Sequence, residues 1–278
     1  MLKLLVIGLA MCGWAAPQDS ELPQWVLQLS RIKRHLRPNF ERLPNYMCQE
    51  TVNRFEKAPN GRDFRLVDTA RLDIAEVGGK ELYSLAGAGR LEEEMPSALA
   101  GTGMFGTGTF SALASNLFVS DAARITGSGQ EKIGGRPVLR YDFEIPQMMS
   151  GFKLTAGGVE AIVGERGTYW VDSESLDLLR LEDNATDIPP TLPMSDVHTV
   201  IDYSRVRIGS SEVILPQSAE MSIVGFDGRK SRNVLEFSGC REYGSESKIT
   251  FGSPEAIPPR QIDVTLTPGP KDAPSKKK

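Results

Sequence analysis

The chain has 278 residues, of which 40% are apolar and 24% charged, and its formal net charge is −4 at pH 7. Setting aside the one basic residue of 1–15 and the five basic and three acidic residues of 252–278 leaves 26 basic and 33 acidic residues, a net charge of −7. A nucleic-acid-binding protein carries a basic stripe for the phosphate backbone. We therefore expect no nucleic-acid partner for this acidic chain.

The first fifteen residues have the layout of a secretory signal. Lys3 precedes an apolar run at 4–11, and Gly13 and Ala15 then occupy the two small-residue positions that favour cleavage after Ala15. The apolar run is shorter than the roughly 20 residues that span a bilayer. The sequence therefore predicts an exported, periplasmic protein with a signal peptide at 1–15 and no transmembrane segment in the mature chain.

A second interpretation of this region is lipid attachment at Cys12. Residues 9–13 resemble a weak lipobox, although Met11 stands where that motif has a small residue. Lipidation would anchor the protein to a membrane, such as the outer membrane, instead of leaving it free in the periplasm. Both interpretations stay open at this stage.

The first expected element of the mature chain is an amphipathic helix. Apolar residues recur at near-helical spacing from Trp25 to Leu36, with basic residues between them. We expect the helix over about 23–37, closed by Pro38. His35 lies among the basic residues on its polar side, where a solvated histidine is expected.

Alternating apolar and polar residues, separated by tight turns, dominate the rest of the chain. Such alternation is the mark of half-buried strands, and short turns join antiparallel neighbours. The expected strands lie at 45–55, 64–74, 80–85, 124–132, 137–145, 165–172, 176–182, 197–208, 213–224, 233–243 and 248–251. They predict one mainly β domain over 16–251, an antiparallel meander whose apolar face needs a cover. The helix at 23–37 and a short helix at about 110–118 are the expected covers.

Two segments show no periodicity. The glycine-rich insertion at 86–109 lacks the Lys-Ser/Thr of a phosphate loop, so we interpret it as a mobile flap or a connector. Together with the short helix after it, the insertion would form a gate that includes Phe105, Phe110 and Leu113. The Pro-rich tail at 252–278 ends in three lysines and predicts a disordered extension.

The most specific stretch is a β-hairpin at 165–182. Its first strand ends in Tyr169-Trp170-Val171-Asp172, a polar turn follows at 173–175, and a second strand runs over 176–182. This phrase resembles one found in the exported lipoprotein-carrier (LolA/LolB-like) proteins. The resemblance implies an unclosed β-barrel whose concave face holds acyl chains beneath a helical lid. The glycine-rich insertion and the lysine-rich tail are departures from that family.

Two of the three cysteines, Cys48 and Cys240, lie in the mature chain. An even pair in an oxidising compartment indicates one disulfide. Two buried free thiols are the alternative. A metal site is a poorer interpretation, because His35 and His198 are the only histidines in the chain.

Catalytic motifs are scarce. Ser150 and Lys153 match a Ser-x-x-Lys pattern, but the companion Lys-Thr-Gly is missing. His198 stands near Asp196, which could orient it, yet no Gly-x-Ser-x-Gly supplies a nucleophile. We therefore expect no enzymatic activity, no catalytic residue and no cofactor.

Large side chains on the expected inner face of the sheet have two interpretations. The candidates for contact with an acyl chain are Tyr141, Phe143, Trp170, Leu179, Leu181, Met221, Ile223 and Phe237. They line a cavity for such a chain, or they pack as an ordinary core. Burial energetics cannot decide, because each CH₂ group gains about 0.8 kcal/mol against protein or lipid alike.

The leading hypothesis is an exported, non-enzymatic carrier that binds a lipid or an acylated protein of the cell envelope. The alternative is an envelope module with a fully packed interior, used for protein–protein interaction or stress sensing. The partner is then an envelope protein and not a lipid.

Overall fold

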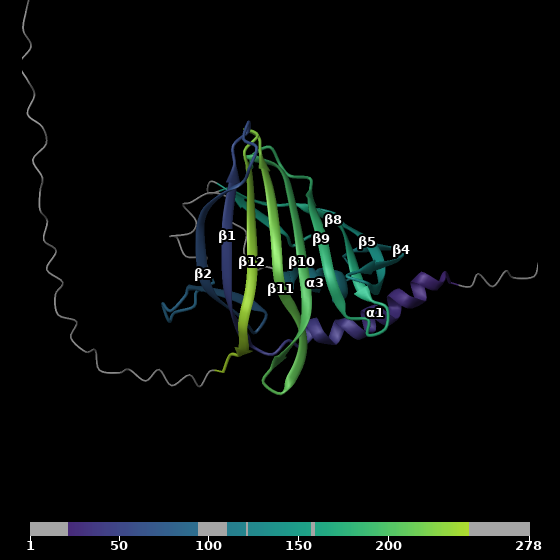
Figure 1. Ribbon diagram of the computed structural model, residues 1–278. Coiled ribbons are helices and arrows are strands. Elements are labelled where there is room, and N and C mark those ends of the chain that lie inside the picture. The colour runs from purple at the N-terminus through teal and green to yellow at the C-terminus, as the bar shows by residue number, and fades with distance from the viewer. Residues whose placement is uncertain (1–21, 94–109, 121, 157–158, 245–278) are drawn as a thin grey trace, which may run out of the picture. The chain divides into compact units, whose positions relative to one another are not determined.

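A computed structural model describes residues 22–93, 110–120, 122–156 and 159–244 (Figure 1). The helices are α1 (Gln24–Glu41) and α3 (Phe110–Phe118). The strands are β1 (Tyr46–Lys57), β2 (Arg65–Val77), β3 (Lys80–Leu85), β4 (Arg124–Ile133), β5 (Arg136–Ile145), β6 (Lys153–Ala156), β7 (Val159–Ile162), β8 (Gly164–Asp172), β9 (Leu178–Thr186), β10 (Met194–Ile208), β11 (Ser211–Gly225) and β12 (Lys230–Glu242). The expected signal peptide, tail and strand at 248–251 lie outside the described residues and stay predictions.

Ten of these strands form one antiparallel sheet in the order β3-β2-β1-β12-β11-β10-β9-β8-β5-β4. Within the described residues, the edge strands β3 and β4 do not pair with each other, so the sheet stays open. Strands β6 and β7 form a separate hairpin. The predicted fold class, a mainly β, unclosed antiparallel barrel with an N-terminal helix, is confirmed.

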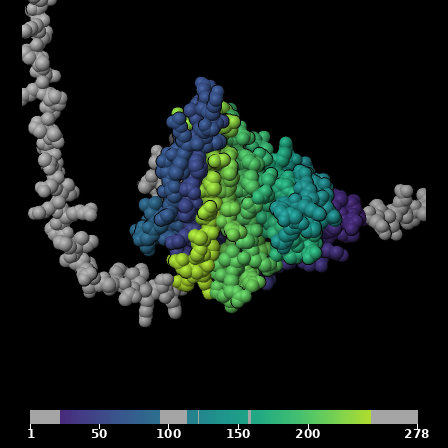
Figure 2. Space-filling model, viewed as in Figure 1, coloured from purple at the N-terminus to yellow at the C-terminus, as the bar shows by residue number. Residues whose placement is uncertain are grey.

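The first and last strands of the described chain are neighbours in the sheet. β1 pairs with β12 over its length, and Figure 2 shows the outer surface of this pairing, with dark blue β1 against yellow-green β12. The register shifts between Met47 and Gln49, where Cys48 faces both Gly239 and Cys240. Gly239 has a left-handed φ of 59°, which glycine adopts readily in a bulge. Cys48 and Cys240 form a disulfide at this point, which confirms the predicted bond.

Helix α1 is longer than the sequence predicted. It continues through Pro38 to Glu41, and the Arg42 N–H donates to the Pro38 carbonyl oxygen at 3.2 Å. A proline inside a helix removes one backbone hydrogen bond and often ends the helix. Here tertiary contacts hold the last turn, because Phe40 is buried in the core and Asn39 bonds to β11.

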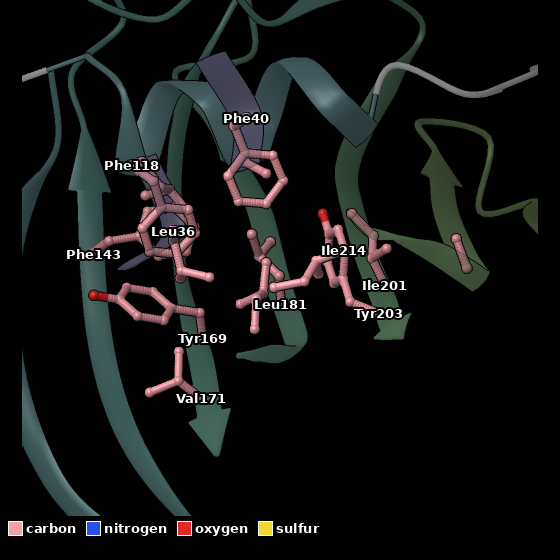
Figure 3. Packing of buried hydrophobic residues seen from close by; sticks show 14 of the residues in the cluster. Leu36, Phe40, Phe118, Phe143, Tyr169, Val171, Leu181, Ile201, Tyr203 and Ile214 are labelled. Atoms are coloured by element: carbon pink, nitrogen blue, oxygen red, sulfur yellow. The ribbon is translucent and has the colours of Figure 1, made fainter. Parts of the chain in front are cut away.

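Both helices pack on the concave face of the sheet (Figure 3). The resulting core contains Ile32, Leu36 and Phe40 of α1, Ala114, Leu117 and Phe118 of α3, and Val52, Leu72, Tyr141, Phe143, Tyr169, Val171, Leu181, Ile201, Tyr203, Ala219 and Leu235 of the sheet. A second buried cluster contains Leu154, Ala156, Val163, Leu192, Met194, Val197, Met221 and Ile223. The apolar face of the sheet is therefore covered over two separate areas.

The β6–β7 hairpin covers the second area and was not predicted. Its buried side chains, Leu154 and Ala156, belong to the same cluster as Met221 and Ile223 of β11. Strands of four residues are too short to show a clear alternation in the sequence. The expectation that the two helices alone cover the sheet is therefore wrong.

The β8–β9 hairpin has a longer turn than the sequence predicted. The Asp172 carboxylate accepts hydrogen bonds from the N–H groups of Glu174 and Ser175 at 2.8 and 2.6 Å, which folds the chain back. Leu176 then adopts a left-handed φ of 62°, far from the extended backbone of a strand. The second strand consequently begins at Leu178 and not at Leu176.

Candidate ligand-binding face

Helices α1 and α3 cover the concave face through apolar side chains. Phe118 of α3 meets Tyr169 of β8 edge to face, with ring centroids 5.2 Å apart, and stacks on Phe40 of α1 at 5.7 Å. Tyr141 of β5 stacks on Tyr169 at 5.4 Å. Apolar contacts are non-directional, so another apolar group can take the place of the helix side chains without leaving a polar partner unpaired.

Polar contacts attach both ends of α1 to the sheet. Near its start, the Tyr141 hydroxyl donates to the Trp25 carbonyl oxygen at 3.3 Å. Trp25 lies against Gly127 of β4, where an added Cβ would fall 2.6 Å from the Trp25 Cβ. Near the helix end, the Asn39 amide donates to the Ile214 carbonyl at 3.1 Å and accepts from the Ile214 N–H at 2.8 Å. Asn39 thus bonds to β11 as a neighbouring strand would.

A third polar contact joins the middle of α1 to the β8–β9 turn. His35 Nε2 lies 2.8 Å from Asp177 Oδ1, and Arg205 of β10 donates to both Asp177 oxygens at 2.7 Å. Burial acts to raise the pKa of Asp177, but hydrogen bonds from Arg205 and His35 outweigh it and lower this pKa. His35 is exposed, as expected of a solvated histidine, and it also contacts Asp177 because α1 lies against this turn.

Six of the eight predicted contact residues lie on the concave face. Tyr141, Phe143 and Leu181 belong to the helix-covered core, and Phe237 packs against it. Met221 and Ile223 belong to the cluster under β6–β7, so the structure divides the predicted set between the two covered areas. A role for these residues in binding an acyl chain stays a prediction.

Trp170 was placed on the wrong face, and strand alternation does not fix the face of Leu179. Trp170 Nε1 donates to Glu131 Oε2 at 2.9 Å, and its ring lies 6.0 Å from the Arg140 guanidinium. Side chains alternate along a strand, so the inward Tyr169 beside it turns Trp170 outward. Leu179 falls at a register shift, where Trp170 pairs with Arg180 and the next residue of β8 pairs with Leu178.

Sequence analysis missed a buried acid on the concave face, Glu50 of β1. Glu50 is 0% exposed, and within the described residues neither carboxyl oxygen has a hydrogen-bond partner. Burial, and then the charge of Glu81, raises the pKa of Glu50 to about 8. The sequence contained an indication of this burial. Side chains alternate along a strand, so Glu50 lies on the same side of β1 as the buried Cys48 and Val52.

Glu165 of β8 and Asp183 of β9 form a second buried acidic group. The Ser150 hydroxyl donates to Glu165 Oε1, whereas Glu165 Oε2 and Asp183 Oδ1 have no hydrogen-bond partner in the described part of the chain. Burial raises the pKa of both carboxyl groups, and the Glu165 charge raises that of Asp183 further. Asp183 pairs in register with the buried Thr199, so polar side chains separate the two apolar clusters.

A cleft of about 430 Å³ opens where α1 and α3 meet the β2–β3 turn. Its walls include Phe40, Leu43, Glu76, Glu81, Ser115 and Asn116. Phe40 also belongs to the helix-covered core, so the cleft reaches the border between the helices and the concave face.

The predicted gate is described only in part. Phe105 lies outside the described residues, and Phe110 begins α3 without a described side chain. Leu113 is partly buried against the helix-covered core. A gating role for these residues stays a prediction.

The catalytic candidates do not form a triad. Ser150 donates to Glu165 and not to a histidine. His198 Nδ1 lies 3.0 Å from Asn184 Oδ1, so its partner is Asn184 and not Asp196. Within the described ranges, no group of three or more His, Cys, Asp or Glu side chains could hold a metal ion. No described helix has the length and hydropathy to cross a bilayer.

Comparisons with known proteins gave solved structures only. No family model and no curated protein matches the chain. An outer membrane lipoprotein-sorting protein domain from Vibrio parahaemolyticus is 12% identical with a TM-score of 0.39, covering 80% of this chain and 94% of that one. A LolA superfamily protein from Nitrosomonas europaea is 11% identical with a TM-score of 0.38, covering 78% and 94%. The lipoprotein LppX of Mycobacterium tuberculosis is 13% identical with a TM-score of 0.27, covering 78% and 97%.

These structures have identities below 15% and TM-scores below 0.5, so they carry no argument about this chain. The function has to be inferred from the concave face and its covers.

Proposed function

We propose that this protein is an exported, non-enzymatic carrier that binds acyl chains of a lipid or an acylated protein on the concave face, beneath α1 and α3. One observation carries the proposal: in an open sheet, two helices cover part of the apolar face with Leu, Ile and Phe side chains. An acyl chain can replace these side chains with little net change, because each buried CH₂ gains about 0.8 kcal/mol in either partner.

Entry of a ligand requires α1 to move, because Ile32 and Leu36 fill the space above the sheet and are 0% exposed. The polar contacts described between α1 and the sheet involve the Trp25 carbonyl and the side chains of His35 and Asn39, at its start, middle and end. Each contact depends on one side chain, that of Tyr141, His35 or Asn39, whose loss would loosen the helix. The helix is therefore built to act as a lid.

Photo-crosslinking tests the proposal. The purified exported protein would be mixed with a phosphatidylglycerol that carries a diazirine in one acyl chain, then irradiated and mapped by peptide mass spectrometry. We expect a retained lipid by native mass spectrometry and labelling of Tyr169 and Leu181 on the concave face. Trp170 and its register partner Arg180 face the other side of the same two strands and serve as internal controls. The carrier function is contradicted if the outward residues are labelled as strongly as the inward ones, or if no lipid is retained.

The packed interior also supports the second candidate, an envelope protein-interaction module. The stacked rings of Phe40, Phe118, Tyr169 and Tyr141 leave the concave face filled by the protein's own side chains. In that case the native mass is that of the protein alone after incubation with lipid. Co-purification of an envelope protein through the outer face of the sheet would then support this candidate.

A further inference from the structure

Glu50 is a buried polar group without a partner on the face where we place the ligand. It lies opposite Leu72 of β2 and Phe237 of β12, both of which belong to or pack on the helix-covered core. Both of its carboxyl oxygens are without a hydrogen-bond partner among the described residues. A buried polar group left unpaired is unfavourable, so such groups in native proteins call for a partner.

Glu50 is a hydrogen-bond donor at neutral pH. Burial and the nearby Glu81 raise its pKa to about 8, so the neutral carboxylic acid predominates at pH 7. A protonated carboxyl group presents one O–H to an acceptor.

The groups around Glu50 favour this neutral form. The titratable or charged side chains on the same side of the sheet and of α1 are Tyr46 and Arg54 of β1, Asp68 and Glu76 of β2, Glu81 and Tyr83 of β3, Tyr203 and Arg205 of β10, Glu242 of β12 and Glu41 of α1. The two cations in this set, Arg54 and Arg205, are paired with Asp68 and Asp177. The described side chains of α3 carry no charge. Acidic neighbours and the absence of a free cation in this described set disfavour an ionised Glu50.

The cleft at the end of the lid lies on the same face. Tyr46 pairs in register with Glu76, and Glu76 with Glu81, so this row of the sheet ends in the wall of the cleft. Glu50 is four residues further along β1, roughly 13 Å at the usual rise of a strand. A molecule that enters through this cleft therefore passes Glu76 and Glu81 at its wall before it reaches Glu50, which lies between Leu72 and Phe237.

We infer that Glu50 donates a hydrogen bond to a carbonyl oxygen of the bound ligand, an ester or amide of a fatty acyl chain. This inference rests on the proposed carrier function and narrows its ligand class. A plain hydrocarbon chain would leave the carboxyl group unpaired, and an ammonium group would need the ionised form. An ester or amide carbonyl supplies the acceptor that the Glu50 O–H lacks among the described residues.

The test compares two phosphatidylglycerols with the same chain length, one with ester-linked and one with ether-linked chains. Binding to the purified exported protein would be measured at about pH 6.5 and about pH 9.5, on either side of the pKa of Glu50 near 8. We expect the wild type to prefer the ester lipid about three- to tenfold at the lower pH, the usual effect of one hydrogen bond. The preference should disappear at the higher pH.

Variants identify the residue that is responsible. Glu50→Gln keeps a neutral donor, so it should keep the ester preference and lose the pH dependence. Glu50→Leu should bind the two lipids equally. Glu165→Gln is the matched control, a buried acid of β8 that Ser150 already contacts, and should behave as the wild type does.

Each result has a distinct meaning. If the wild type retains neither lipid, the carrier function fails and the role of Glu50 fails with it. If the wild type binds both lipids equally at both pH values, the carrier stands and the role of Glu50 is overturned. Tighter binding at high pH that Glu50→Gln abolishes would overturn the donor role, because it would show that the ionised carboxylate accepts a hydrogen bond from the lipid. Thermal unfolding of Glu50→Gln confirms that the variant used for these conclusions is folded.

Discussion

Glu50 makes the stability of the protein depend on pH. Its pKa is about 8 in the folded protein, against 4.5 ordinarily, so the folded state holds a proton that the unfolded chain releases. The resulting stability is fully present below about pH 4.5 and is lost as the pH rises through 8. The shift corresponds to at most about 4–5 kcal/mol.

Replacing Glu50 by glutamine should remove this dependence. We expect the free energy of unfolding of Glu50→Gln to exceed that of the wild type at pH 8 by several kcal/mol, and the two proteins to converge near pH 4.5. Urea unfolding at a series of pH values measures the difference. Parallel curves for the two proteins across this range would show that Glu50 is not buried as a neutral acid.

Among elements, α1 combines an apolar face with polar attachments. Asn39→Ala removes the two hydrogen bonds to the backbone N–H and carbonyl of Ile214. Ile214 is a residue of β11 that is only 2% exposed. The unpaired backbone groups should lower the free energy of unfolding by about 1–3 kcal/mol. Hydrogen exchange should increase selectively in α1.

Arg34→Ala is a matched control for Asn39→Ala, because Arg34 is exposed on the same helix. It should leave both the stability and the exchange of α1 close to the wild type. If Asn39→Ala instead raises exchange evenly throughout the sheet, α1 is a fixed part of the core and not a lid.

Most elements could be predicted from the sequence because their strands are long and alternate cleanly. The strand expected at 213–224 agrees with β11, and the short helix expected at 110–118 agrees with α3. The start of β9 was missed, since it depends on how the Asp172 carboxylate folds the turn. The end of α1 was missed because contacts of Phe40, remote in sequence, overcome the effect of Pro38.

The candidate site was harder to predict than the fold. Tyr141, Phe143 and Leu181 were placed correctly, since strand parity alone decides their side. Trp170 was misplaced because a large aromatic residue suggests burial, whereas Glu131 and Arg140 stabilise it on the outer face. Glu50 was missed because an acid inside a strand is ordinarily taken as solvent-facing.

For the whole molecule, the pairing of β1 with β12 joins residues near both ends of the described chain. The disulfide at this pairing connects residues 192 positions apart. In the chain-entropy model, a loop of this length stabilises the fold by about 5 kcal/mol, and native disulfides typically contribute about 2–5 kcal/mol.

The double variant Cys48→Ala/Cys240→Ala should therefore unfold at lower denaturant concentration, by a difference of about 2–5 kcal/mol. The wild type should show the same loss when a reducing agent is added, and the double variant should not respond to the reducing agent. Denaturant unfolding with and without the reductant measures both effects. Equal stability of all four samples would mean that strand pairing alone holds β1 to β12.

The same bond changes how the protein responds to tension. When the chain is pulled from its two ends, the load passes across Cys48–Cys240, and the strands between the two cysteines carry none of it. Only a reduced molecule could be drawn out further, by on the order of 600–700 Å for the 192 positions at full extension. An oxidised molecule under tension therefore keeps the strands between the two cysteines unloaded, whereas α1, which precedes Cys48 in the chain, bears the load.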